Sequence, residues 1–179
     1  MIEDRLLISR CKHGNRAAFC RIYEKYESDL RTLAANLLDD KTEAEDVVHD
    51  VFTSFLLAVK NFELKSNLKG FLLTCVANKA RDYARKRQRQ KVIPINEAQM
   101  TMSEADGPLQ LIERSDRIRK LTRAMTQLRY EQREAIVLHL HGAMRFKAIA
   151  KLQNVSIKTA HSRYRLGLER LKSILDGKV

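Results

Sequence analysis

The sequence predicts an all-α protein made of two small helical domains joined by a flexible linker. Apolar residues recur at helical spacing over most of the chain, whereas strand-like alternation of β-branched residues is scarce. Only two prolines and six glycines interrupt the 179 residues. The helical pattern is lost over residues 92–110, around Gly107 and Pro108, so we expect a linker between domains 1–91 and 111–179.

The overall charge favours a polyanionic partner. The chain carries a formal net charge of +12, and nucleic acid is the commonest partner of so basic a protein. No apolar run approaches the length of a membrane span, and the first residues carry acids where a signal peptide would be basic. We therefore expect a cytoplasmic protein without a membrane span.

The cysteines predict neither a disulfide framework nor a cofactor site. They are three in number and form no CxxC pair. Cys11, His13 and Cys20 are conceivable metal ligands, but their spacing matches no known structural zinc site, and small buried hydrophobes are the better interpretation. We expect no metal and no cofactor.

Two helices open the first domain. Residues 3–12 form a short helix that Gly14 closes, and Asn15 is placed to cap a longer second helix. That second helix carries a continuous apolar seam, which predicts a core position. The seam consists of Phe19, Ile22, Tyr23, Tyr26, Leu30, Leu33, Ala34 and Leu37.

The third helix is acidic outside and apolar inside. Thr42 and Glu45 have the spacing of a capping box. Residues 39–50 hold six acids and one Lys, and Asp46, His49 and Asp50 share one face, which favours docking to a protein. A metal-dependent phosphohydrolase of the His-Asp type is the alternative, although the other histidines lack acidic partners. The expected inner face is Val47, Val48, Val51, Phe52, Phe55, Leu56 and Val59.

The fourth helix, residues 70–91, changes character along its length. Its first half is apolar, whereas residues 79–91 hold seven Lys or Arg and one Asp. This density exceeds what complements a helix dipole, and it indicates contact with a phosphate backbone. Asn78, Arg81, Asp82 and Arg85 project from the same stretch as Tyr83, a combination that suits exposed bases.

The second domain ends in a predicted helix-turn-helix at residues 145–172. Helical patterns over 118–128 and 131–141 precede it, and Gly142 is expected to stop the latter. Asn154 tolerates the positive φ of the turn, and Ser156 is an N-cap. Eight Lys or Arg stand against Glu169 alone in this stretch, which predicts DNA binding in a major groove. The expected buried stripe of the last helix is Ile157, Ala160, Tyr164, Leu168, Leu171 and Leu175.

Three blocks in this order resemble a known family. They are EAEDVVHDVF, GFLLTCVANKARDYARKRQR and LTRAMTQLRYEQREAIVLHLHGAMRFKAIAKLQNVSIKTAHSRYRLGLERL. The chain is similar to bacterial RNA polymerase sigma factors of the extracytoplasmic-function (ECF) class of the sigma-70 family, which keep only regions two and four. The resemblance implies a transcription initiation factor without catalysis. Its implied partners are core RNA polymerase, at the β′ clamp helices and the β flap, promoter DNA and an anti-sigma factor.

The resemblance also implies roles for individual residues. Core polymerase would contact Asp46, Val47, Val48, Asp50 and Val51. The loop at Lys65, Ser66 and Asn67 would capture a flipped minus-ten base, and Asn78, Arg81 and Arg85 would support the separated strand. The minus-thirty-five duplex would face Lys158, Thr159, Ser162, Arg163 and Arg165.

Several positions depart from the family pattern. Phe71 stands where Trp is usual, Arg129 where Pro is common, and Asn154 where Gly is usual, and the loop ELKSN lacks a Gly. Gly167 lies inside a helix where Ala is common, at a cost of about 1 kcal/mol in helix propensity. These changes leave the class unaltered and the promoter preference open. The alternatives are a stand-alone helix-turn-helix regulator, the phosphohydrolase, and an anti-sigma-like adaptor.

Overall fold

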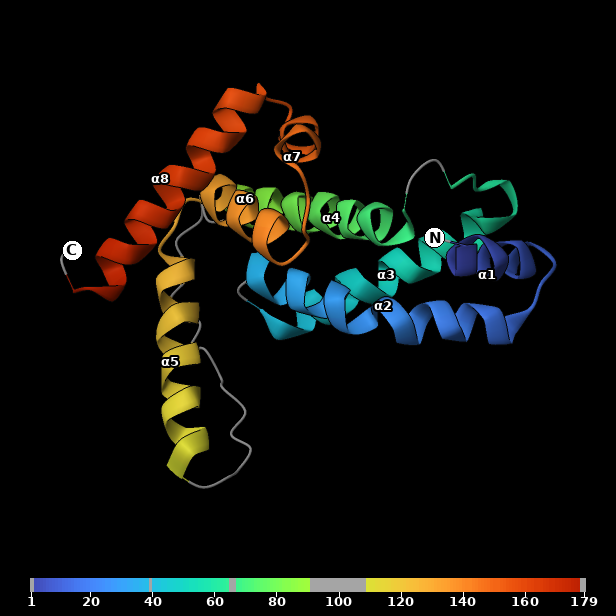
Figure 1. Ribbon diagram of the computed structural model, residues 1–179, viewed down its shortest axis with the longest axis horizontal. Helices are drawn as coiled ribbons and strands as arrows, with labels where there is room; N and C mark the ends of the chain where they lie inside the picture. The colour runs from blue at the N-terminus through green and yellow to red at the C-terminus, as the bar shows by residue number, and fades with distance from the viewer. Residues whose placement is uncertain (1, 39, 65–66, 91–108, 178–179) are drawn as a thin grey trace.

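The described part of the chain is helical throughout. The computed structural model describes residues 2–38, 40–64, 67–90 and 109–177, and these ranges contain no strand (Figure 1). The N-terminal bundle consists of α1 (Ile2–Lys12), α2 (Arg16–Leu37), α3 (Lys41–Ala58), the short 3-10 helix η1 (Val59–Asn61) and α4 (Leu68–Gln90). The C-terminal bundle consists of α5 (Leu109–Thr126), α6 (Tyr130–Leu140), α7 (Phe146–Gln153) and α8 (Ile157–Leu175). Most of the predicted linker lies outside the described ranges.

The helix ends in the N-terminal bundle follow their local chemistry, with one correction. Gly14 adopts a φ of +79°, and the side chain of Asn15 accepts a hydrogen bond from the Ala18 amide at 3.0 Å, as predicted. The predicted capping box at Thr42 is wrong. Asp40 is the N-cap of α3, because its carboxylate accepts from the amides of Thr42 and Glu43.

The N-terminal core lies where α2 packs between α3 and α4. The predicted seam of α2 contributes Ile22, Leu30 and Leu33, all buried. Leu56, which was predicted to face inward, is partly exposed, and so is Phe71 in the apolar first half of α4. Phe71 nevertheless contacts Phe62, with ring centroids 4.7 Å apart, so the ring closes the edge of the core near the end of η1.

The C-terminal bundle depends on a close approach of α6 and α8. A Cβ atom added to Gly167 would lie 2.9 Å from the Ile136 side chain and 3.1 Å from the Cβ of Gln132. The glycine that weakens α8 in propensity therefore allows the two helices to pack closely. Ile157 and Leu175 of the predicted buried stripe are exposed, and so are Ile118, Leu121 and Leu140 of α5 and α6.

The two bundles contact each other, chiefly through α2 and α6 (Figure 1). The Arg133 guanidinium donates to the carbonyl oxygen of Leu37 at 3.0 Å. His141 Nε2 lies 3.3 Å from the carbonyl oxygen of Asp29. Both acceptors belong to α2, and the two side chains come from α6 and from the residue that caps its C-terminal end, so the contact holds α6 against α2. Separately, no helix in the described ranges is long and apolar enough to cross a membrane.

Candidate nucleic-acid interface

The helix-turn-helix has the predicted turn. Asn154 takes φ 53° and ψ 49°, the left-handed conformation, and its amide ends α7. The Ser156 hydroxyl then accepts from the Thr159 amide at 3.0 Å and starts α8. Asn tolerates this conformation because its side chain is short and polar. The turn therefore sets α7 and α8 in the arrangement that places a second helix against DNA.

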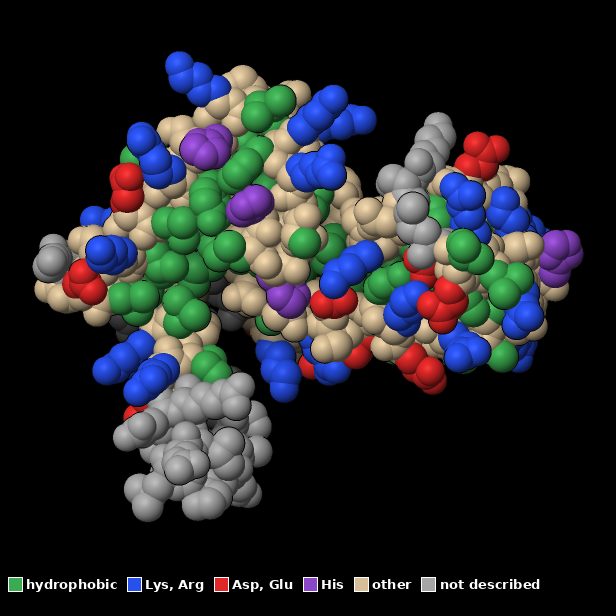
Figure 2. Space-filling model, viewed as in Figure 1, with side chains coloured by type: hydrophobic (Ala, Val, Ile, Leu, Met, Phe, Trp, Pro, Cys, Tyr) green, Lys and Arg blue, Asp and Glu red, His purple; other side chains and the backbone are tan. Residues whose placement is uncertain are grey.

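The residues predicted to contact duplex DNA lie on the outer side of α8, and we call them the duplex face: Lys158, Thr159, Ser162, Arg163 and Arg165. Lys158, Thr159 and Arg165 are exposed, whereas Ser162 and Arg163 are half-buried. In Figure 2, Lys and Arg side chains project over α7 and the N-terminal end of α8, where this view shows no acidic side chain. Such a surface attracts phosphate and offers donors to base edges.

Aromatic rings support α8 from behind the duplex face. Phe146 of α7 stacks on His139 of α6, with ring centroids 4.3 Å apart, and its ring lies 5.3 Å from that of Tyr164. His139 Nδ1 is 2.9 Å from the carbonyl oxygen of Met144. Three helices thus share one aromatic cluster, which fixes the orientation of α8 relative to α6 and α7.

The residues predicted to hold a separated strand lie on α4 and just before it, and we call the described ones the strand face: Asn67, Asn78, Arg81 and Arg85. Lys65 and Ser66 fall outside the described ranges. Asn78 and Arg85 are exposed on α4. Asn67 is exposed as well, but its side-chain oxygen caps α4 by accepting from the Gly70 amide. Only its remaining polar atoms are available to a base.

A cavity of about 820 Å³ opens between the strand face and the C-terminal bundle. Asn67, Phe71 and Asn78 line it from the N-terminal bundle. Arg145 and Lys151 line it from the opposite side. Asn67 and Asn78 are exposed, but they face a second wall formed by the turn before α7 and by α7 itself.

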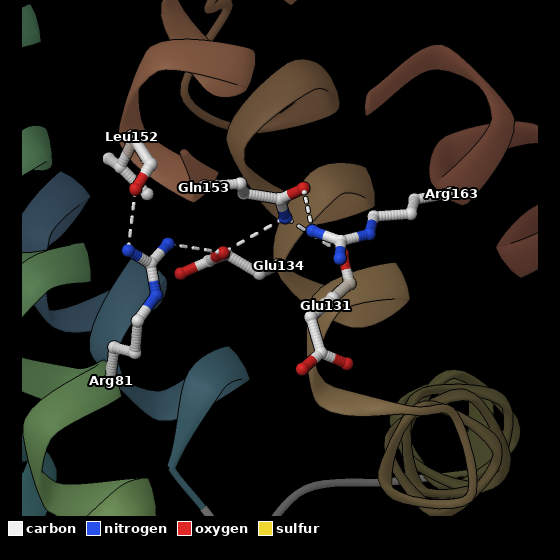
Figure 3. Close-up of polar contacts among 6 residues, drawn as sticks. All are labelled: Arg81, Glu131, Glu134, Leu152, Gln153 and Arg163. Carbon is white, nitrogen blue, oxygen red and sulfur yellow. Dashed lines mark hydrogen bonds and ion pairs between the residues drawn. The ribbon is translucent and has the colours of Figure 1, made fainter. Parts of the chain in front are cut away.

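Arg81 links the two bundles through a carboxylate (Figure 3). Its guanidinium donates to Glu134 Oε2 at 2.7 Å and to the carbonyl oxygen of Leu152 at 2.6 Å. Gln153 donates to the same Glu134 oxygen at 2.9 Å and accepts from Arg163 at 2.9 Å. One residue of the strand face and one of the duplex face are therefore joined through Glu134 and Gln153.

Glu134 is a buried carboxylate whose charge depends on its neighbours. Its side chain has 0% exposure. Burial raises the pKa of Glu134, and the Arg81 charge and the hydrogen bonds from Arg81 and Gln153 oppose this effect. Burial and the nearby carboxylate likewise raise the pKa of Tyr130. Oε1 of Glu134 is buried without a hydrogen bond among the described residues, so Oε2 makes all of these contacts.

The acidic face of α3 differs from the predicted polymerase surface in three of its five residues. Val47, Val48 and Val51 have exposed fractions of 0%, 4% and 2%. They point into the core at the positions where α3 meets α2, so they cannot present a surface to a partner in this structure. Asp46 and Asp50 are exposed, and we call these two residues the docking face.

The docking face carries one ion pair. Asp50 lies 2.8 Å from Lys79 of α4, with both side chains well exposed, so the pair contributes little to stability and leaves the carboxylate accessible. His49 is also exposed beside it. Within the described ranges, no three His, Cys, Asp or Glu side chains converge as metal ligands.

Sequence analysis missed Glu134, Gln153 and the basic cavity wall. A lone Glu on an amphipathic helix normally lies in solvent, and no periodicity marks it as buried. The sequence offers one signal that Glu134 is buried: apolar residues, Ala135 and Ile136, follow it directly in the same helix.

Comparison with known proteins identifies the family. The model of Sigma-70 region 2 matches residues 22–90, and that of Sigma-70, region 4 matches residues 118–171. Together they cover more than half of the chain. The chain belongs to the sigma-70 family of RNA polymerase sigma factors. This sigma factor is 25% identical to the ECF RNA polymerase sigma factor SigX of Bacillus subtilis, over 88% of this chain and 84% of the relative. It is also 25% identical to the RNA polymerase sigma factor CarQ of Myxococcus xanthus, over 94% and 95%.

Solved structures agree with this assignment. The sigma factor RpoE of Bartonella quintana, in complex with the anti-sigma factor NepR, matches with a TM-score of 0.68 and 26% identity, over 88% of this chain and 96% of that chain. CnrH, in complex with the cytosolic domain of CnrY, has the same fold, with a TM-score of 0.67 and 22% identity over 99% of both chains. The protein is an ECF sigma factor, a transcription initiation factor that directs RNA polymerase to promoters, and not an enzyme.

Proposed function

We propose that the sigma factor uses three separate surfaces in initiation. The docking face, Asp46 and Asp50, binds core polymerase. The strand face, together with the loop that contains Lys65 and Ser66, holds the melted minus-ten strand. The duplex face reads the minus-thirty-five element. We also propose domain limits of 1–91 and 111–179, with a linker at 92–110, and action in the cytoplasm, where polymerase meets the chromosome.

The observation that carries this proposal is the placement of two cationic faces on two different bundles. Lys79, Arg81, Arg85 and Lys86 follow one another along α4, whereas Lys158, Arg163 and Arg165 lie on α8. Two such faces help each other only when their separation is fixed, and a flexible linker alone leaves the effective concentration low. Core polymerase, bound through the acidic docking face, supplies this fixed separation.

An anti-sigma factor is the partner we propose for the free protein. RpoE of Bartonella quintana was solved in complex with the anti-sigma factor NepR. The cavity between the two bundles, with its basic wall at Arg145 and Lys151, offers a polypeptide a surface on both bundles at once. Binding there would occupy the cavity that Asn67 and Asn78 of the strand face line.

Run-off transcription tests the proposal. Purified protein is added to sigma-free core polymerase with fragments of the source genome, including the region upstream of its own gene. We expect discrete new transcripts. Asp50→Arg should weaken them by reversing charge on the docking face, and Arg163→Ala should weaken them about tenfold by removing a base contact.

Matched variants separate these effects from general damage. Glu24→Arg reverses an exposed acid on α2, and Arg170→Ala removes an exposed arginine on α8 outside the duplex face. Both should transcribe normally. Tight binding of promoter duplex by the protein alone, without polymerase-dependent transcripts, would instead establish the stand-alone regulator.

A further inference from the structure

We propose that the C-terminal bundle of the free sigma factor inhibits its own strand face, and that Glu134 is the residue that does so. In the structure the guanidinium of Arg81 donates to Glu134, whereas the proposed function needs the same guanidinium to bind the melted strand. DNA and Glu134 therefore compete for one arginine. This inference rests on the proposed function, because it assigns the strand face to single-stranded DNA.

The first step is that both terminal nitrogens of the Arg81 guanidinium already have partners in the C-terminal bundle. One Nη donates to the Leu152 carbonyl oxygen and the other donates to Glu134 Oε2, at 2.6 and 2.7 Å. The side chain of Arg81 is 17% exposed. Three of its five N–H donors make no hydrogen bond within the described ranges, but with so little of the side chain exposed a phosphate oxygen has poor access to them in this arrangement. Arg81 must leave Glu134 before it binds a strand.

The second step is that Glu134 needs Arg81 only while the bundles are closed. Among its described partners, Arg81 alone carries the opposite charge, and Gln153 supplies a neutral donor. A buried carboxylate without a cation is strongly disfavoured. If the bundles separate, water reaches the carboxylate and Arg81 becomes available. Separation of the bundles thus exposes both ions to water at the same time. The ion pair therefore stabilises the closed form and not the open form.

The third step is that the closed form also places the C-terminal bundle opposite a neighbouring strand-face residue. Asn78 lines the cavity whose opposite wall is Arg145 and Lys151 of the C-terminal bundle. A second hydrogen bond across the contact, from Arg133 to the Leu37 carbonyl oxygen, holds the same closed arrangement. The C-terminal bundle therefore engages Arg81 directly and faces Asn78, which stays exposed, across the cavity.

The test measures binding of the full-length free protein to random-sequence single-stranded DNA by fluorescence anisotropy. Glu134→Gln keeps the shape and removes the charge, and we expect binding to tighten about tenfold, as for loss of one charge-assisted hydrogen bond. Glu27→Gln is the matched control, because it removes a carboxylate that pairs with Arg31 within α2. It should leave binding unchanged.

A double variant shows that the gain acts through Arg81. In Glu134→Gln with Arg81→Gln, the tighter binding should disappear. Small-angle X-ray scattering should show a larger radius of gyration for Glu134→Gln than for the parent protein. If circular dichroism shows that Glu134→Gln has unfolded, Arg133→Met opens the same contact and leaves Glu134 in place. Its tighter binding should also depend on Arg81.

Three results would overturn the inference. The first is unchanged binding of single-stranded DNA by Glu134→Gln and Arg133→Met when both variants are folded. The second is tighter binding that persists after Arg81→Gln. The third is a larger radius of gyration without tighter binding. Polymerase-dependent transcription by the parent protein is measured separately. It tests the proposed function, whether or not Glu134 acts in the free protein.

Discussion

At the scale of single residues, the sharpest local strain lies at Ala143. Its φ is +49°, whereas the preceding Gly142 does not take a positive φ. A left-handed conformation costs an L-residue roughly 1–2 kcal/mol, and glycine avoids this cost while losing more entropy on folding. We expect Ala143→Gly to raise the free energy of unfolding by about 1 kcal/mol in urea titrations.

The matched control for Ala143→Gly is a variant, Ala148→Gly, for which we expect the free energy of unfolding to fall. Ala148 is exposed in the interior of α7, where glycine lowers stability by about 1 kcal/mol. If both variants lose stability, the positive φ of Ala143 does not carry the free-energy cost that we assign to it.

Sequence analysis succeeded at residues whose chemistry is local and failed where the reason lies elsewhere in the fold. Asn154 and Ser156 have their predicted conformations because a turn and an N-cap depend only on adjacent backbone. Gly142 was expected to end α6 by the usual route, yet Ala143 takes the left-handed conformation. A Cβ on Gly142 would lie 2.7 Å from the Leu138 carbonyl oxygen. Close approach to this backbone atom explains the glycine, and spacing in the sequence cannot show it.

At the scale of elements, the apolar pattern predicted each helix and which side of it is buried. It predicted less well how far along the helix the burial extends. The valines of α3 were expected both in the core and on the polymerase surface, and burial decides for the core. Ile157 and Leu175, at the two ends of α8, fit its helical period but are exposed. Periodicity gives a direction around the helix axis, whereas the length of the neighbouring helix determines where burial stops.

The junction of α1 and α2 makes a pH-dependent contribution to stability. The buried Asp4 accepts from Tyr26 and Lys25, each at 2.8 Å. Burial opposes the charge of Asp4, but the hydrogen bonds from Lys25 and Tyr26 outweigh it and lower its pKa below the ordinary 3.8. A lowered pKa means that the ionised carboxylate stabilises the folded state above pH 3.8. That stabilisation is lost as the pH falls through the lowered pKa.

We expect Asp4→Asn to lower the free energy of unfolding by about 2 kcal/mol at pH 7, and the difference to vanish at low pH. Urea unfolding of both proteins across a pH series measures this. Glu24→Gln, which changes an exposed acid of α2, should follow the parent protein at every pH. An equal difference at every pH would mean that Asp4 acts through packing and not through its charge.

At the scale of the whole molecule, the contact between the bundles was the part that sequence could not predict. Each bundle follows from its own periodicity, but Arg81 and Glu134 are 53 residues apart and belong to different helices. Both have the residue types of a solvated surface, and Arg81 was assigned to DNA alone. The structure gives that arginine a partner in the other bundle, Glu134, which no local pattern in the sequence indicates.

The closed and open forms should differ in how salt affects DNA binding. The Arg81–Glu134 pair is largely buried and is screened little, whereas each phosphate contact on a single strand releases counterions and adds about 0.7 to the slope of log affinity against log salt. In Glu134→Gln, Arg81 is free to bind one more phosphate. We therefore expect a slope steeper by about 0.7 than that of the parent protein. Anisotropy titrations at several salt concentrations measure the two slopes. Equal slopes would mean that the released arginine does not contact the strand, and Glu27→Gln should reproduce the slope of the parent protein.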